Sequence, residues 1–145
     1  MASAEYISDI DYRSLAEFRY QIRRFLHFSE RAARDAGLEP QQHQLMLALR
    51  GWPDSEQPPS IRLLAEQLQL EHNTLVGLVD RLVERGMVTR SRALGDRRQV
   101  LVRLTERGEA ELEKLAIHHL TELRGNGPKL VRALEDLTRR SNGSE

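Results

Sequence analysis

The sequence contains no cysteine. This absence excludes a disulfide framework, a thiolate nucleophile, a cysteine zinc site and a peroxide-sensing thiol. Lysine is almost as scarce, because Lys114 and Lys129 are the only lysines among the 22 basic residues and the rest are arginine. No stretch approaches the roughly 18 consecutive apolar residues of a membrane span. We therefore expect a soluble cytoplasmic protein without a membrane partner.

Familiar catalytic motifs are missing as well. The sequence has no GxGxxG, no phosphate-binding loop, no GxSxG and no HExxH. We therefore expect no enzyme, no catalytic residue and no cofactor. His27 with Glu30, and His118 with Glu122, have the spacing of two metal ligands on one helix. Such pairs arise often by chance on helical surfaces, so we expect no bound metal.

The sequence does have the composition of an ordinary globular domain. Its 145 residues are 39% hydrophobic and 30% charged, which predicts one domain over residues 1–145 with a core of its own. The net charge is zero, but it is unevenly distributed. Residues 72–103 hold seven arginines and three acidic residues, for a local charge of +4. A local excess of this kind favours a polyanionic partner.

The spacing of apolar residues predicts a mainly α fold with one small β-hairpin. The predicted helices cover residues 10–36, 40–50, 61–68, 72–85, from 105 to a break at 125–128, and 128–139. The predicted strands cover residues 87–92 and 99–104. In the second strand we expect Val100, Val102 and Leu104 on one face and Leu101 and Arg103 on the other. Ser60 is expected to cap the third helix and Thr105 the fifth.

The two short helices over 61–68 and 72–85, joined by a tight break, form a helix-turn-helix pattern. A hairpin follows directly, and its tip is rich in arginine. The arginines concerned are Arg90, Arg92, Arg97 and Arg98. We favour a wing that touches DNA, over about residues 90–99, rather than a merely solvated hairpin.

The helix over 72–85 is then the candidate recognition helix, with its polar face toward the major groove. Its outward face is expected to consist of His72, Asn73, Thr74, Val76, Gly77, Asp80 and Arg81. Asn73 either reads adenine or only caps the helix, and Gly77 either permits close backbone approach or only relieves crowding. Thr74 suits a phosphate or a thymine methyl, and Arg81 suits guanine or a phosphate. Asp96 carries the wrong charge for DNA, so we expect it to brace the wing.

Several of these segments resemble the MarR family of bacterial transcription regulators. Residues 73–82 resemble its recognition helix, and residues 84–88 resemble the exit from that helix into the wing. The sequence Asp96-x-Arg98-x-x-x-Val102-x-Leu104-Thr105 matches the family's wing pattern, and Gly37-Leu38-x-Pro40-x-Gln42 resembles the start of its second helix. Glu71 and Gly95 depart from the usual family residues.

The resemblance implies a winged helix-turn-helix homodimer that binds a pseudo-palindromic operator in double-stranded DNA. The winged module would cover residues 40–104, and the dimerisation helices would cover 10–36 and 105–140. Wide apolar stripes on those flanking helices independently favour packing against a second copy. Such regulators repress or activate transcription, and we expect a repressor, relieved by a small-molecule effector.

An effector pocket is a further hypothesis. It would lie near the junction of the dimerisation and DNA-binding modules and would be lined by Phe25, Phe28, His43, Met46 and Trp52. The alternative, which we favour, is that these are core or interface residues. Two rival functions also stay open, namely a protein-interaction module that does not bind DNA and a small enzyme with a pocket between its helices.

Overall fold

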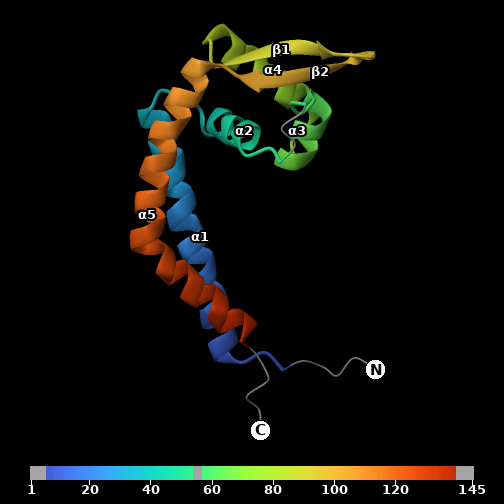
Figure 1. Ribbon diagram of the computed structural model, residues 1–145. Coiled ribbons are helices and arrows are strands. Elements are labelled where there is room, and N and C mark those ends of the chain that lie inside the picture. The colour runs from blue at the N-terminus through green and yellow to red at the C-terminus, as the bar shows by residue number, and fades with distance from the viewer. Residues whose placement is uncertain (1–5, 54–56, 140–145) are drawn as a thin grey trace, which may run out of the picture. The chain divides into compact units, whose positions relative to one another are not determined.

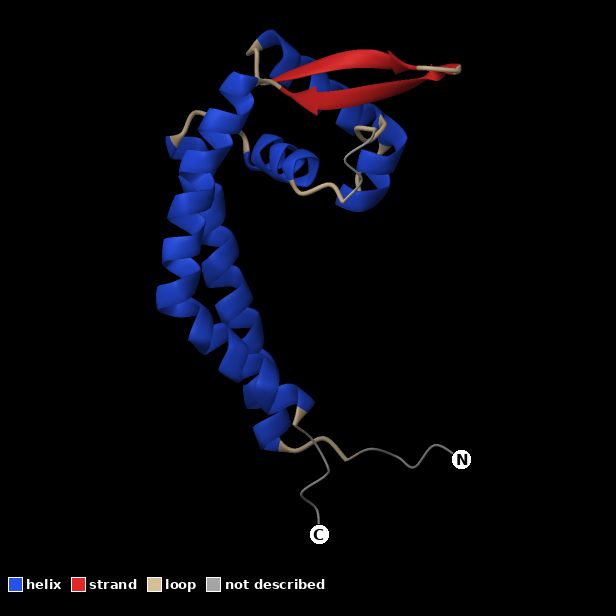
Figure 2. Cartoon of the chain, viewed as in Figure 1, coloured by secondary structure: helices blue, strands red, loops and turns tan. Residues whose placement is uncertain are grey.

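The computed structural model describes residues 6–53 and 57–139, with the backbone alone described at Arg97. The chain forms five helices and one hairpin within these ranges (Figures 1 and 2). The elements are α1 (Asp9–Asp35), α2 (Pro40–Arg50), α3 (Ile61–Leu68), α4 (His72–Glu84), β1 (Val88–Ala93), β2 (Asp96–Leu104) and α5 (Glu106–Thr138). None of the described helices is long and apolar enough to cross a membrane.

The elements divide into two compact units. The hairpin unit runs from Glu30 to Ile117, and the two-helix unit joins the chain up to Ser29 with the chain from His118 onward. The hairpin unit contains the end of α1, all of α2, α3, α4 and both strands, and the start of α5. The expected mainly α fold with a small hairpin is therefore confirmed.

One apolar core holds the hairpin unit together. Its largest fully buried side chains come from α2, α3, α4 and the two strands. They are Leu45, Met46, Leu64, Leu75, Leu78, Val79, Leu82, Val88 and Val102. Burial of a side chain of this size contributes roughly 1.5–3 kcal/mol to the free energy of unfolding, so this core fixes α4 against the hairpin.

Local signals set the ends of α3 and α4 where the sequence predicts them. Ser60 Oγ accepts a hydrogen bond from Leu63 N at 3.2 Å and so caps α3. Gln69 adopts a left-handed φ of 56° after α3, and Gly86 has φ 73° after α4. The N-cap of α4 is Glu71, which puts Asn73 at the second helical position. Asn73 is therefore not the cap.

The hairpin is antiparallel, with Val88 opposite Leu104 and Arg92 opposite Val100. Of the two residues expected to share one face of β2, Leu101 is buried and Arg103 is exposed. The physical reason is a third extended segment before α3. Ser60 bridges to Leu101, and Val102 N donates to the Pro59 carbonyl at 3.0 Å. This segment covers β2 and ties it to the start of α3.

The connection from β2 into α5 requires a glycine. Thr105 caps α5 by accepting a hydrogen bond from Gly108 N at 3.0 Å, and its hydroxyl donates to the Gly86 carbonyl at 2.6 Å. A Cβ on Gly108 would lie 2.1 Å from the Met87 carbonyl oxygen. The glycine thus replaces the glutamate that would complete a capping box, because only a residue without a side chain fits there.

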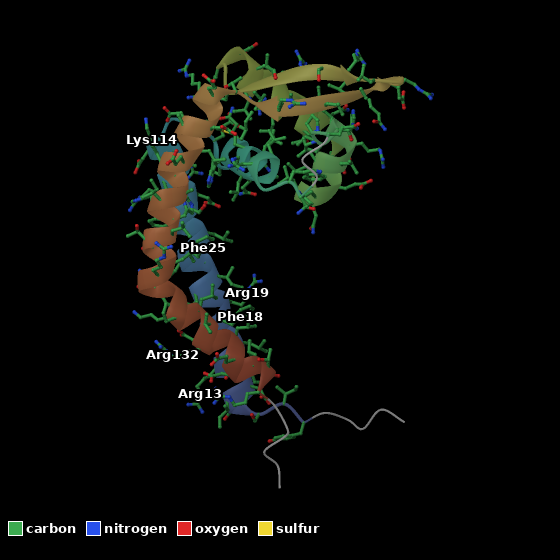
Figure 3. All side chains as sticks on the ribbon, in the orientation of Figure 1. Arg13, Phe18, Arg19, Phe25, Lys114 and Arg132 are labelled. Atoms are coloured by element: carbon green, nitrogen blue, oxygen red, sulfur yellow. The ribbon has the colours of Figure 1, made fainter. Side chains whose placement is uncertain are left out.

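In the two-helix unit, α1 and α5 lie side by side (Figure 1). Figure 3 labels Phe18 and Phe25 on this part of α1, and both are partly buried. Phe28 contacts the rings of His118 and His119, and His119 Nε2 lies 2.8 Å from Ser29 Oγ.

The predicted break at residues 125–128 is wrong. Helix α5 continues through Pro128, although proline removes one backbone hydrogen bond and crowds the preceding turn. Leu123 and Leu130, on either side of the break, line one small cavity with Phe25 of α1. Packing of this continuous apolar stripe against α1 outweighs the local preference of the glycines and proline. Asn126 Nδ2 also donates to Glu122 Oε1 at 2.7 Å within the helix.

Candidate nucleic-acid interface

Helix α4 presents a polar face beside the hairpin. Its apolar stripe lies in the core, while His72, Asn73, Thr74 and Arg81 are exposed. Val76 and Gly77 are partly buried on the same side of the stripe. All of the candidate recognition residues therefore reach the surface of one helix, as a helix in the major groove requires.

A groove adjoins this face and runs between the starts of α3 and α4 and the hairpin. Four arginines line it, together with His72 of α4 and Asp96 of the wing. They are Arg62 from α3, Arg90 and Arg92 from β1, and Arg98 from β2. The structure thus gathers basic side chains from three elements along one surface, and positive charge of this kind attracts a phosphate backbone.

Arg62 is a groove residue that the sequence alone did not single out. It forms an exposed ion pair with Glu66, with 3.1 Å between Arg62 Nη1 and Glu66 Oε1. The spacing of four residues makes the pair look like an ordinary solvated helix contact. Its place in the groove depends on how α3 packs against the hairpin. The one local signal was its position two residues after the Ser60 cap.

Two ion pairs hold the basic side chains near α4. Asp80 accepts a hydrogen bond from Arg90 Nη1, which links α4 to β1. Arg81 Nη2 lies 3.4 Å from Glu39 Oε2 at the start of α2. A Cβ on Gly77 would lie 3.4 Å from Arg81 Nη1. An added Cβ would thus only touch the end of the Arg81 side chain, so the position of Arg81 does not depend on the glycine.

The hairpin tip is braced by Asp96. Its Oδ1 accepts a hydrogen bond from the backbone N of Arg98 at 3.0 Å and lies 3.5 Å from Arg98 Nε. The Arg98 side chain remains 95% exposed. Arg92 lines the groove, and the side chain of Arg97 lies outside the described residues. The tip thus combines a braced turn with outward-pointing positive charge.

The residues of the hypothetical effector pocket lie in different parts of the chain. His43 and Met46 are buried in the hairpin unit, and Trp52 is partly buried against its core. Phe25 and Phe28 belong to the two-helix unit, where both contact the His119 ring. Burial of Met46 and His43 gives both a core role.

Comparison with known proteins finds a family that the DNA-binding part of this arrangement resembles. A model of the MarR family matches residues 36–99, which include α2, α3, α4, β1 and the hairpin tip. This segment, less than half of the chain, is therefore similar to the MarR family. The candidate recognition helix and the start of the wing lie inside the matched segment, so the resemblance of residues 73–82 and 84–88 is confirmed.

A solved MarR-family structure shares the fold over nearly the whole chain, and a second regulator shares it over a smaller part. AbsC, a MarR family transcriptional regulator from Streptomyces coelicolor, superposes with a TM-score of 0.75 and 24% identity, over 94% of this chain and 90% of that one. The PcaV transcriptional regulator from the same organism, solved with its natural ligand, gives a TM-score of 0.55 and 25% identity over 72% and 75% of the two chains. The winged-helix fold expected from the sequence is confirmed.

Sequence similarity to a curated protein is confined to a shorter segment. The organic hydroperoxide resistance transcriptional regulator of Bacillus subtilis is 38% identical over 55 residues, which cover 38% of this chain and 37% of that regulator. The chain therefore matches little more than a third of that relative's length.

Proposed function

We propose that this chain, whose residues 36–99 resemble the MarR family, is a homodimeric, sequence-specific DNA-binding regulator that acts in the cytoplasm. The observation that carries the proposal is the junction of two surfaces in the hairpin unit. The exposed face of α4 adjoins a groove with arginines from α3, β1 and β2. In this arrangement α4 enters the major groove, and the wing over residues 90–99 reaches the flanking minor groove.

The direct test is binding to DNA from upstream of the protein's own gene, followed by the effect of Arg98→Ala. Arg98 is exposed, so its loss should leave folding intact. Binding should weaken most for duplexes with A/T-rich flanks, because narrow minor grooves favour an inserted arginine. Arg139→Ala is the matched control, since Arg139 is also exposed and pairs with Glu135 at the far end of α5. Equal weakening by both variants would contradict a role for the wing.

Dimerisation is supported by the apolar surface of the two-helix unit. Large apolar side chains stand exposed along α1 and along α5 from Leu120 onward. They are Ile10, Tyr12, Leu15, Tyr20, Leu26, Leu120, Val131 and Leu134. A patch of this kind marks an interaction surface, and a second copy with the same helices would cover it about a two-fold axis.

Sedimentation at micromolar concentration tests the dimer. We expect one dimeric species with a total buried area above about 1,600 Å². Val131→Glu should weaken the dimer, because it would bury an unpaired charge in that interface. Glu135→Gln, on the same helix, should not. A stable folded monomer of the wild-type chain would contradict the proposal.

The regulator is further proposed to be a repressor that a small molecule releases from DNA. PcaV was solved with its natural ligand, which supports an effector for this chain as well. The chain has no cysteine, so a thiol-based response to hydroperoxides is not available to it. A promoter–reporter assay with and without this chain tests repression, and increased expression in its presence would contradict it.

A further inference from the structure

Leu94 is the most exposed large apolar side chain in the described parts of the chain. It stands fully exposed at the hairpin tip. Single exposed leucines are common on protein surfaces and usually need no explanation. This one differs in its surroundings, because it projects from the narrowest point of a basic wing.

The turn itself does not call for a leucine. Leu94 and Gly95 form the two-residue connection between β1 and β2, and of the two only Gly95 has a positive φ, at 89°. Glycine is needed at such a position, but the residue before it needs only an ordinary negative φ. The Asp96 carboxylate then fixes the tip by accepting the Arg98 amide hydrogen. Leu94 is therefore free to serve a purpose outside the fold.

The width of the hairpin tip determines which part of it, and so which side chain, can enter a DNA minor groove. Nothing lies within 4 Å of a Cβ built on Gly95, so no other described part of the chain packs against the end of the hairpin. A minor groove is about 6 Å wide, whereas two paired strands are about 4.8 Å apart before their side chains are added. Only the two-residue tip can enter such a groove, and Leu94 supplies its single large side chain.

Charge around the tip favours DNA over an apolar protein partner. Arg98 is exposed on β2, and Arg92 is exposed near the end of β1, two residues before Leu94. The Asp96 carboxylate is close to the Arg98 guanidinium, with 3.5 Å between Oδ1 and Nε, which reduces repulsion of phosphates. Arginines on both strands can therefore bind phosphates on the two sides of the minor groove, while the leucine faces the base edges inside it.

We propose that Leu94 is a minor-groove wedge. It packs against sugars and base edges beside each half-site and partly unstacks one base step. Apolar side chains inserted in this way kink the duplex, and flexible pyrimidine–purine steps such as TA yield most readily. The wedge therefore adds a preference for a deformable step in the flank. This inference rests on the DNA-binding function proposed above.

The test uses full-length protein and duplexes enriched from a random pool by the wild type. 2-Aminopurine is placed at successive flank positions, because its fluorescence rises when it is unstacked. We expect wild-type protein and Leu94→Met to raise the signal at one step. Leu94→Ala should lose that rise and bind about tenfold more weakly, since a leucine-sized contact is lost. Leu47→Ala, which changes an exposed leucine on α2, should match the wild type.

Two results distinguish failure of the wedge proposal from failure of the proposed DNA-binding function. If the wild type enriches no duplex, both the DNA-binding proposal and the wedge are overturned. If Leu94→Ala binds the enriched duplexes as the wild type does, with the same fluorescence, the wedge alone is overturned. Leu94→Lys distinguishes charge from shape, because it should keep affinity through phosphates while losing the fluorescence rise.

Discussion

Asp80 on α4 accepts a hydrogen bond from Arg90 on β1, so one ion pair joins the candidate recognition helix to the first strand of the wing. Both side chains are nearly half exposed. Exposed pairs contribute little to the free energy of unfolding, typically about 0.2–1 kcal/mol. The structural effect of this pair is to hold the Arg90 guanidinium on the groove side of α4.

A double-mutant cycle on this pair is the first prediction. Asp80→Asn and Arg90→Ala should each lower the free energy of unfolding slightly. The double variant should lose less than their sum, with a coupling of about 0.2–1 kcal/mol. Urea denaturation at fixed protein concentration measures it. Strictly additive losses would mean that the pair is not formed in solution.

Alanine substitutions at two glycines of α5, Gly108 and Gly125, are expected to change the free energy of unfolding in opposite directions. Helix propensity alone favours alanine over glycine by about 1 kcal/mol. Gly108→Ala should nevertheless destabilise by about 1–3 kcal/mol, because its Cβ would overlap the Met87 carbonyl. Gly125→Ala, which has nothing within 4 Å of its Cβ, should stabilise by roughly 0.5–1 kcal/mol. Chemical denaturation of both variants decides it, and equal signs would contradict the described junction.

Arg81 is expected to contact DNA after exchanging its Glu39 partner for a base or phosphate. Arg81→Ala should weaken binding by about 1–3 kcal/mol and relax the preference at one base pair if the guanidinium reads guanine. If it holds a phosphate, all duplexes should weaken alike. Binding to a panel of single-base variants distinguishes the two cases.

The control for Arg81 is Arg50→Ala. Arg50 also forms an exposed ion pair, with Arg50 Nε 3.6 Å from Glu109 Oε1, but it does not line the groove. It should leave DNA affinity unchanged. Arg81→Ala with wild-type affinity would remove Arg81 from the interface.

Asp96→Ala separates wing geometry from charge. Removing a carboxylate should by itself help a basic tip bind DNA. Loss of its hydrogen bond to the Arg98 amide should instead loosen the turn, at a cost of roughly 0.5–1.5 kcal/mol. We expect the second effect to dominate, so affinity should fall and amide exchange at the tip should rise. Tighter binding with unchanged amide exchange would show that Asp96 is only a solvated acid.

Much of the fold was predictable because its signals are local. Ser60, Gly86 and Thr105 each mark an element boundary through their own backbone or side-chain chemistry, and each does so in the structure. The break predicted at Pro128 failed because the contacts that keep α5 continuous come from α1, about 100 residues away in sequence. Burial of Leu101 was missed for the same reason, since the covering segment at Ser60 is not adjacent in sequence.

The candidate site was predictable in part. The polar face of α4 follows from the spacing of its apolar stripe, and the resemblance to the MarR family identified the wing motif. The pairing of Arg81 with Glu39 and the position of Arg62 in the groove require the packing of separate helices. Neither has a sequence pattern of its own, because ion pairs between elements depend on where those elements meet.

The salt dependence of DNA binding shows most directly whether the arginines of the groove and wing face DNA. Two hairpin units per dimer should neutralise roughly 6–10 phosphates, and each neutralised phosphate releases counterions. Titration of an enriched duplex between 50 and 200 mM salt should therefore show affinity falling by about 10³–10⁵-fold. A nearly flat dependence would contradict the account, because it would mean that the arginines of the groove and wing do not face DNA.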